Sequence, residues 1–205
     1  MARMRGYGIF CLEGEWNADL RDRVSVEPIL RLLETLGIAP SIHRDVATRD
    51  ELTYYIGKWE QKRYDDFKVL YLAMHGDSGL INLGRDTFDL DELASLLKGK
   101  CAGKAIYFGS CLTLKQDSRR LQQFARTTGA KAVVGYRREV PWLECAAFEV
   151  LLLDRLSRGV RSDALFNRLT KEHGLFAKSL GLVVATKSQV HRVALREIKA
   201  LPRGE

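Results

Sequence analysis

Two side chains that can do covalent chemistry together, His75 and Cys111, each follow an apolar segment typical of a buried strand. His75 comes directly after KVLYLAM, and Cys111 comes directly after KAIYFGS. An imidazole beside a thiol can accept the thiol proton and create a thiolate, which is the nucleophilic form of cysteine. This pair of residue types therefore indicates a cysteine hydrolase.

The spacing of the two residues fits neighbouring parallel strands. Functional side chains in open α/β sheets lie beyond the carboxyl ends of the strands, so both side chains are expected at the same edge of the sheet. The 36 positions that separate them hold a predicted small hairpin or exposed excursion at 76–89 and a helix capped by Asp89 and Glu92. That length suits a single right-handed crossover between two adjacent strands.

Acyl transfer at Cys111 also requires donors for the negative charge that develops on a substrate carbonyl oxygen. The backbone N–H groups of Gly76 and Cys111 are the natural pair for this oxyanion hole. Because Gly76 has no side chain, a substrate backbone can approach it closely. His75 would act first as general base and then as the acid that protonates the leaving amine.

Strands and helices alternate along the whole chain, which predicts an α/β fold with a mostly parallel sheet and helices on both faces. The 205 residues show no linker or repeat and fit a single domain over 1–205. Strands are expected at 6–14, 41–46, 68–74, 104–110, 131–136 and 181–187. The predicted helices run from Ser25 to Gly37, from Thr48 to Trp59, from Asp89 to Gly99, up to Gly129, from Pro141 to Arg158 and over 161–172.

Apolar residues at helical spacing predict which helix faces are buried. In the first helix they are Ile29, Leu32, Leu33 and Leu36, and in the second they are Leu52, Tyr55, Ile56 and Trp59. The capping box of the second helix pairs Thr48 with Glu51. The segment 181–187 could serve as an edge strand for pairing in a homodimer, or could be an internal strand.

The composition excludes several other classes of function. The formal net charge is +7, but the basic residues are scattered and no nucleic-acid-binding motif accompanies them, so no nucleic-acid partner is expected. No apolar stretch reaches the roughly 20 residues of a membrane span, and the first residues lack a secretory-signal pattern. We therefore expect a cytoplasmic protein that does not bind membranes.

Metal ions and cofactors are not expected either. The four cysteines, Cys11, Cys101, Cys111 and Cys145, lack the close spacing of zinc sites and redox motifs. No glycine-rich phosphate-binding loop follows the first strand, which argues against a flavodoxin-like receiver domain. Cys11 and Cys145 are interpreted as core residues, and the remaining histidines as surface residues: His43, His173 and His191.

The segments LAMHGDSG and IYFGSC resemble the two catalytic motifs of the caspase-like superfamily of cysteine peptidases. That superfamily includes caspases, metacaspases, separase, gingipains and the bacterial CHAT domains. The resemblance covers about residues 5–149 and implies a caspase-like three-layer sandwich. It implies His75 as base and acid, Cys111 as nucleophile and the Gly76 amide in the oxyanion hole. The caspase pentapeptide itself is absent, because FGSCL has no Gln before the Cys and no Gly two positions after it.

The stretch VVGYRREVPWLECAAFE resembles the segment after the following strand in CHAT and separase-like members. There a tryptophan and an acidic residue help to form the pocket for the side chain that precedes the cut. This implies substrate-binding roles for Trp142 and Glu144, with Glu144 favouring a basic side chain. Arg137 and Arg138 could instead recognise an acidic one, and Trp142 could simply pack in the core.

Together these observations predict a caspase-like cysteine endopeptidase that hydrolyses a protein or peptide substrate through an acyl-thioester at Cys111. Bacterial relatives of this kind work in defence, including antiviral defence, and in programmed cell death. The resemblance also implies a separate regulatory partner protein, because the chain carries no sensor module. The alternative is a catalytically inactive member of the same fold that acts as a regulatory or binding protein.

Overall fold

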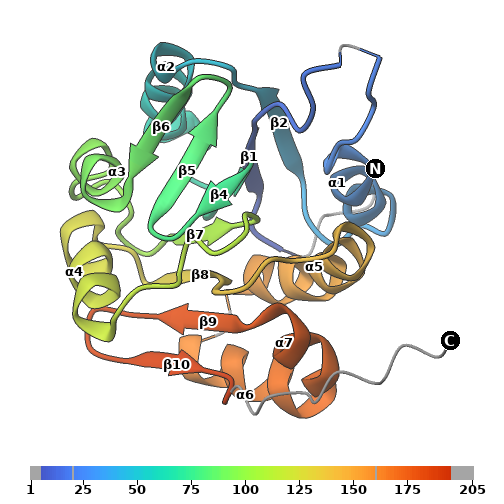
Figure 1. Cartoon of the computed structure of the whole chain (residues 1–205), viewed down its shortest axis with the longest axis vertical. Coiled ribbons are helices and arrows are strands. Elements are labelled where there is room, and N and C mark those ends of the chain that lie inside the picture. Colours follow the sequence, from blue (N-terminus) through green and yellow to red (C-terminus); the bar gives the residue numbers. More distant parts are fainter. Residues whose placement is uncertain (1–5, 20, 160, 195–205) are drawn as a thin grey trace, which may run out of the picture.

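The computed structural model describes residues 6–19, 21–159 and 161–194, and its centre is a seven-stranded sheet (Figure 1). The strands are β1 (Ile9–Glu13), β2 (Ser41–Asp45), β3 (Val69–Ala73), β7 (Ala105–Phe108), β8 (Ala132–Tyr136), β9 (Leu182–Ala185) and β10 (Val190–Arg192). Their order is β10-β9-β8-β7-β3-β1-β2. Strands β2, β1, β3, β7 and β8 run parallel to one another, whereas β9 runs antiparallel to both β8 and β10.

A small antiparallel sheet follows β3 and consists of β4 (Gly76–Asp77), β5 (Leu80–Leu83) and β6 (Asp86–Asp89). It corresponds to the hairpin predicted between His75 and the next helix. The helices are α1 (Glu27–Thr35), α2 (Arg49–Trp59), α3 (Leu90–Leu96), α4 (Ser118–Thr128), α5 (Trp142–Ser157), α6 (Ser162–Glu172) and α7 (Gly174–Leu180), with a 3-10 turn at Lys62–Tyr64.

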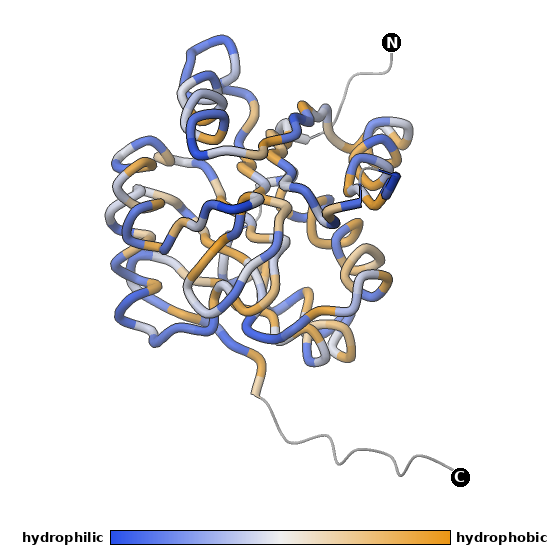
Figure 2. The backbone as a smooth tube through the Cα atoms, turned by 45° about the horizontal axis from the view of Figure 1, so that its top comes forward, coloured by the Kyte–Doolittle hydropathy of each residue, from blue (hydrophilic) through white to orange (hydrophobic). Residues whose placement is uncertain are grey.

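The helices cover the large sheet on both faces, which confirms the predicted α/β layers. Successive residues of a strand point to opposite faces, so Phe10 and Leu12 join one core while Ile9 and Cys11 join the other. Helices α2, α3 and α4 pack on the first core, and α1, α5, α6 and α7 pack on the second. Along the helices in Figure 2, hydrophobic and hydrophilic stretches alternate, as expected for helices with one face on a sheet.

Both predicted capping boxes are present. The Thr48 side chain accepts a hydrogen bond from the backbone N–H of Glu51, and the Glu51 side chain in turn bonds the N-cap backbone. Asp89 and Glu92 make the same reciprocal pair at the start of α3. These contacts satisfy backbone donors that the first helical turn leaves without partners.

The predicted inner face of α1 is confirmed for Leu33 and for partly buried Ile29, but it is wrong for Leu32 and Leu36. Leu32 and Leu36 are 43% and 59% exposed, whereas Val26, Leu30 and Leu33 are buried. Two apolar stripes overlap in this helix, and packing against α5 selects the one that starts at Val26. The helix begins at Glu27 with Val26 rather than Ser25 at the N-cap position, although the Ser25 hydroxyl still accepts a hydrogen bond from the backbone N–H of Glu27 at 3.0 Å.

The carboxy-terminal part of the fold holds two elements that the sequence pattern did not predict, α7 and β10. Because β10 pairs with β9, the segment 181–187 contains an internal strand rather than a free edge. Sheet-edge pairing through this segment is therefore excluded. None of the helices within the described residues is long and apolar enough to cross a membrane.

Candidate active site

His75 and Cys111 lie just beyond the carboxyl ends of two adjacent parallel strands. Strands β3 and β7 pair in register, with Leu72 opposite Phe108. Both side chains line one cavity of about 130 Å³. The other lining residues are Trp16, Val26, Gly109, Val140, Trp142, Cys145, Ala146 and Glu149. The fold thus brings the two residues predicted from the sequence to the same cavity.

The imidazole of His75 is oriented by a main-chain carbonyl group. Its Nε2 lies 2.8 Å from the carbonyl oxygen of Trp16. Because a carbonyl oxygen only accepts, Nε2 must carry the proton, and the neutral ring keeps Nδ1 as its proton acceptor. Among the described residues, no hydrogen bond joins His75 to Cys111 directly.

Cys111 is the accessible thiol of the protein. It is half-buried, whereas the other three cysteines are buried and none is in a disulfide. Burial raises the pKa of Cys101 to about 12 and raises the pKa of Cys11 and Cys145 as well. The Sγ of Cys111 accepts a hydrogen bond from the backbone N–H of Val140 at 3.4 Å.

The backbone around Cys111 is held in an unusual conformation. Leu112 has a φ of +58°, and it is the one non-glycine residue with positive φ in the part of the chain that the structure describes. Its N–H donates to the carbonyl of Arg138 at 3.1 Å. Such left-handed residues cost about 1–2 kcal/mol and cluster at functional sites. Among the described residues, the Cys111 N–H has no acceptor, so it is free to bind an oxyanion.

Gly76 packs directly against the Cys111 loop. A Cβ at this position would lie 2.3 Å from Thr113 Oγ1, 2.7 Å from the Cys111 carbonyl oxygen and 2.9 Å from Ser110 Cβ. The glycine is therefore required by contact with the protein's own backbone, in addition to any approach of a substrate. Asp77 bonds the N–H of Ser78, which is a turn contact and not one with His75.

Helix α5 supplies one wall of the cavity through a single helical face. The lining residues Trp142, Cys145, Ala146 and Glu149 follow the i, i+3, i+4, i+7 spacing. Trp142 packs edge-on against Trp16, with ring centroids 4.8 Å apart. Glu144 lies outside this face, is exposed and does not line the cavity.

The two arginines after β8 are also outside the cavity. The guanidinium of Arg137 donates to the carbonyl of Val193, and its Nε is buried with no hydrogen-bond partner among the residues that the structure describes. Burial and the neighbouring Arg192 and Arg138 lower the pKa of Arg137. The structure therefore brings together His75, Cys111, Gly76 and Trp142, but not Glu144 or Arg137.

The acidic group of the cavity is Glu149, which sequence reasoning missed. It is 3% exposed, and its Oε1 accepts hydrogen bonds from the hydroxyls of Tyr71 at 2.8 Å and Tyr107 at 2.7 Å. The thiol of Cys145 also lies 3.6 Å from Oε1. The Oε2 has no hydrogen-bond partner among the described residues, so it is the atom that Glu149 can offer to an occupant. Burial raises the pKa of Glu149 to about 7, although the tyrosine hydroxyls oppose the shift.

Helical spacing from Trp142 was the signal that could have found Glu149. Its partners were not readable in the same way, because Tyr71 and Tyr107 come from strands far away in the sequence. The apolar neighbours of Glu149 in the sequence also give no sign of these partners. Tertiary packing made Glu149 part of a buried polar group.

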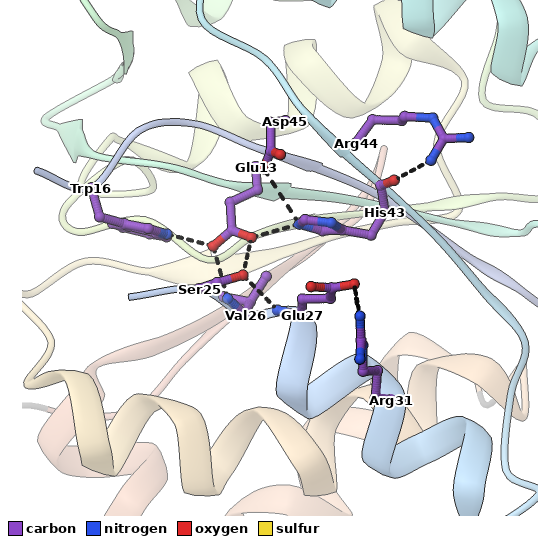
Figure 3. A network of polar contacts seen from close by, with 9 residues as sticks. All are labelled: Glu13, Trp16, Ser25, Val26, Glu27, Arg31, His43, Arg44 and Asp45. Atoms are coloured by element: carbon purple, nitrogen blue, oxygen red, sulfur yellow. Dashed lines mark hydrogen bonds and ion pairs between the residues drawn. The ribbon is translucent and has the colours of Figure 1, made fainter. Parts of the chain in front are cut away.

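A second buried carboxylate, Glu13, forms a hydrogen-bonded network at the carboxyl end of β1 (Figure 3). It accepts from the Trp16 indole N–H at 2.5 Å, the Ser25 hydroxyl at 2.7 Å and the Val26 N–H at 2.8 Å. The imidazole Nε2 of His43 lies 2.6 Å from Oε2, the oxygen that also accepts from Ser25, whereas Trp16 and Val26 bond Oε1. Burial by itself would raise the pKa of Glu13, but these hydrogen bonds together lower it.

The prediction that His43 is a surface residue is wrong, because its side chain is only 16% exposed and it pairs with Glu13. The hydrogen bond to Glu13 raises the pKa of His43. The prediction is wrong for His191 as well, since its ring is partly buried and stacks on Phe166 at 5.3 Å. Glu13, His43 and Asp45 have ligand-type atoms within 4.8 Å of one another, but both Glu13 oxygens and the His43 Nε2 are already engaged in hydrogen bonds, so we interpret the group as a polar network and not as a cation site.

Comparison with known proteins places this geometry in context. No curated protein sequence matches the chain. The structure is similar to the X-ray structure of a secreted C11 cysteine protease from Bacteroides thetaiotaomicron in complex with an irreversible peptide inhibitor. The TM-score is 0.55 at 10% sequence identity, and the match covers 88% of this chain and 66% of that protease, just under two thirds.

The likeness to the C11 protease establishes the fold, which is the caspase-like α/β sandwich predicted from the sequence. Sequence comparison places the chain independently of that structure. Residues 6–183, from just before β1 into β9, match one family along nearly the whole described fold. The chain belongs to the family of unknown function DUF6642.

Proposed function

We propose that the protein is a caspase-like cysteine endopeptidase with His75 as general base and Cys111 as nucleophile. The observation that carries this proposal is that both side chains line a single cavity at the carboxyl edge of the sheet. The accessible Cys111 thiol and the Nε2–H tautomer of His75 support it. The likeness in fold to a cysteine protease supports it as well.

The proposed reaction proceeds in two halves. His75 Nδ1 takes the proton of the Cys111 thiol, and the thiolate attacks the carbonyl carbon of the scissile peptide bond. The Cys111 N–H, with that of Gly76, stabilises the oxyanion of the tetrahedral intermediate. The imidazolium then gives its proton to the leaving amine, and the C–N bond breaks to leave a thioester. Water, deprotonated by His75, hydrolyses the thioester and releases the carboxylic acid and the free thiol.

The cavity also supports a substrate preference, for a basic side chain before the cut. Trp16 and Trp142 form aromatic walls that can pack on the apolar stem of a lysine or arginine. Glu149 presents a buried oxygen that such a cation would bond, and the cation would in turn favour the ionised carboxylate. In this proposal Glu149, rather than Glu144, recognises the charge.

Covalent labelling tests the proposed dyad. A peptidyl acyloxymethyl ketone with lysine at its carboxyl end is expected to label the wild-type protein at Cys111 alone. Cys111→Ala should abolish labelling, and His75→Ala should slow it at least 100-fold, since an activating base contributes about 10²–10⁴-fold. Labelling that is as fast in His75→Ala as in the wild type would contradict the dyad.

The absence of a direct His75–Cys111 hydrogen bond among the described residues favours a second candidate, a catalytically inactive binding protein of the same fold. That candidate predicts slow labelling that is indifferent to His75. It also predicts that the probe peptide still binds, which fluorescence anisotropy with a non-reactive peptide would measure.

The ratio of kcat/KM for lysine and norleucine substrates tests the role of Glu149. Because the dyad ionises identically with both substrates, its pH dependence cancels in the ratio. The ratio should rise as the pH passes through about 7, where Glu149 loses its proton. In Glu149→Gln the ratio should be low and independent of pH, whereas Glu144→Gln should behave like the wild type. An unchanged ratio in Glu149→Gln would refute the preference.

A further inference from the structure

Trp16 is the residue that connects the separate parts of this site. Its carbonyl oxygen accepts the hydrogen bond of His75, and its ring packs edge-on against both His75, at 5.3 Å, and Trp142, at 4.8 Å. It lines the cavity of the dyad, an acidic cavity of about 340 Å³ next to Glu13, and a third of about 370 Å³ next to Asn82. Displacement of Trp16 would therefore change the orientation of His75 and the shape of the site together.

Trp16 is itself not part of a helix or strand. It lies in a bend after β1, outside the strand ladders of the sheet. Its indole N–H donates to Glu13 Oε1 at 2.5 Å, and this is the one polar contact of its side chain within the described residues (Figure 3). Glu13 is the last residue of β1 and is 3% exposed, so it is a fixed point next to a loop residue.

Glu13 is itself held by an opposite charge. Of its four donors, Ser25, Val26 and Trp16 are neutral, and His43 is the only one that titrates. Strands β1 and β2 pair with Cys11 opposite His43, which places Glu13 two residues further along on the same face as the imidazole. A buried carboxylate is costly unless it is paired and hydrogen-bonded.

Among the described residues, the guanidinium of Arg44 donates to the main-chain carbonyl of His43, and three acidic groups lie near the imidazole. They are Glu13 of β1, Asp45 of its own strand at 3.8 Å, and Glu27 in the first turn of α1. Each favours the imidazolium. Glu27 is shared with Arg31, with which it forms an ion pair at 2.8 Å.

We propose that Glu13 and His43 form a charged anchor that fixes Trp16, and that Trp16 thereby positions the catalytic imidazole of His75. The inference rests on the proposed peptidase function, because the group that it positions is the proposed base. Glu13 and His43 are positioning residues and touch no reacting atom. When His43 loses its proton, Glu13 loses its counter-charge and the anchor weakens, so that the geometry of the dyad becomes sensitive to pH.

The physical link can be tested without any activity. The protein has three tryptophans, so an ¹H–¹⁵N spectrum has three indole signals, which Trp16→Phe, Trp59→Phe and Trp142→Phe assign. The Trp16 signal is expected to shift with pH around a midpoint above 6.5, the ordinary value for histidine. His43→Gln should abolish this titration, and His75→Ala should preserve it. A titration that follows His75 instead of His43 would overturn the proposed anchor.

The positioning role is tested by alkylation of Cys111 with iodoacetamide, a reagent too small to need the substrate cavity. His43→Gln and Glu13→Gln are expected to slow alkylation about 10- to 100-fold at pH 6.5, as small misplacements of catalytic groups do. In a His75→Ala background, His43→Gln should cause no further decrease, because the two act in one chain. His173→Gln, at a histidine outside this network, is the matched control.

The outcomes separate the two proposals. If His75→Ala leaves the alkylation rate unchanged, the proposed dyad fails, while the Trp16 spectrum still decides whether the anchor exists. If His75→Ala slows alkylation but His43→Gln does not, the dyad stands and the anchor is refuted. Additive effects of His43→Gln and His75→Ala would also refute it, because they would indicate independent structural damage. If Glu13→Gln does not fold, the His43→Gln variant alone decides whether the anchor exists, because His43 is partly exposed.

Discussion

Substitution of Glu149 by glutamine should make the stability of the protein less dependent on pH. The carboxyl group is buried between α5 and the sheet, and its pKa rises from an ordinary 4.5 to about 7 in the folded state. A raised pKa means that the folded state binds the proton more tightly than the unfolded chain does. The protonated group therefore supports the fold fully below pH 4.5, and this support is lost as the pH rises towards and through 7.

The magnitude follows from the difference between the two pKa values. A shift of one unit corresponds to about 1.36 kcal/mol, so complete ionisation of Glu149 lowers the free energy of unfolding by about 3 kcal/mol. Between pH 5 and pH 8 the loss is about 2 to 3 kcal/mol. Glutamine has nearly the same shape, can still accept from Tyr71 and Tyr107, and does not ionise.

Urea unfolding of the wild type and Glu149→Gln at pH 5 and pH 8 measures this difference. The variant should gain about 2 to 3 kcal/mol relative to the wild type at the higher pH, because all other titrating groups are common to both proteins. Glu144→Gln, an exposed glutamate on the same helix, should show no such gain. If Glu149→Gln and the wild type lose stability in parallel as the pH rises, the assignment of a buried, proton-binding Glu149 is refuted.

Three further outcomes are expected from the packing around the site. Gly76→Ala should lower the free energy of unfolding by about 1–3 kcal/mol and reduce activity, because the new Cβ would overlap Thr113 Oγ1 and the Cys111 carbonyl. Thermal melting measures the loss of stability, and an unchanged melting temperature would contradict the packing. Mass spectrometry after brief iodoacetamide treatment should find one alkyl group per native chain, on Cys111, and four after unfolding, whereas early reaction at any other cysteine would oppose the burial described. Trp59→Phe should lower the free energy of unfolding in urea by about 1–3 kcal/mol, because the substitution removes the indole N–H that bonds the Phe67 carbonyl. A change near zero would mean that another donor replaces the indole N–H.

Much of the fold could be predicted from local sequence patterns. Apolar runs such as the one before His75 have the length and continuity of strands buried on both faces, and Thr48 and Asp89 mark helix starts by chemistry that acts within four residues. The placement of His75 and Cys111 at one edge of the sheet follows from the same patterns, because parallel strands share the direction in which they end.

The partners of the buried polar groups could not be predicted in this way. Glu149 bonds Tyr71 and Tyr107, which lie 78 and 42 positions away in the sequence, and Glu13 pairs with His43, 30 positions away. A periodic pattern tells which face of a strand or helix is buried, but not which residue of another element comes opposite it. That choice depends on strand register and on how α5 lies across the sheet.

The sequence by itself determined the alternation of elements, the helix caps and the common edge of His75 and Cys111, since each depends on residues close together in the chain. The tertiary structure decided that Glu149 rather than Glu144 faces the cavity, and that Trp16 lies between the dyad and Glu13. Those contacts arise only when β1, β2, β3 and α5 are assembled, because burial changes the energy of a polar side chain according to the groups that surround it.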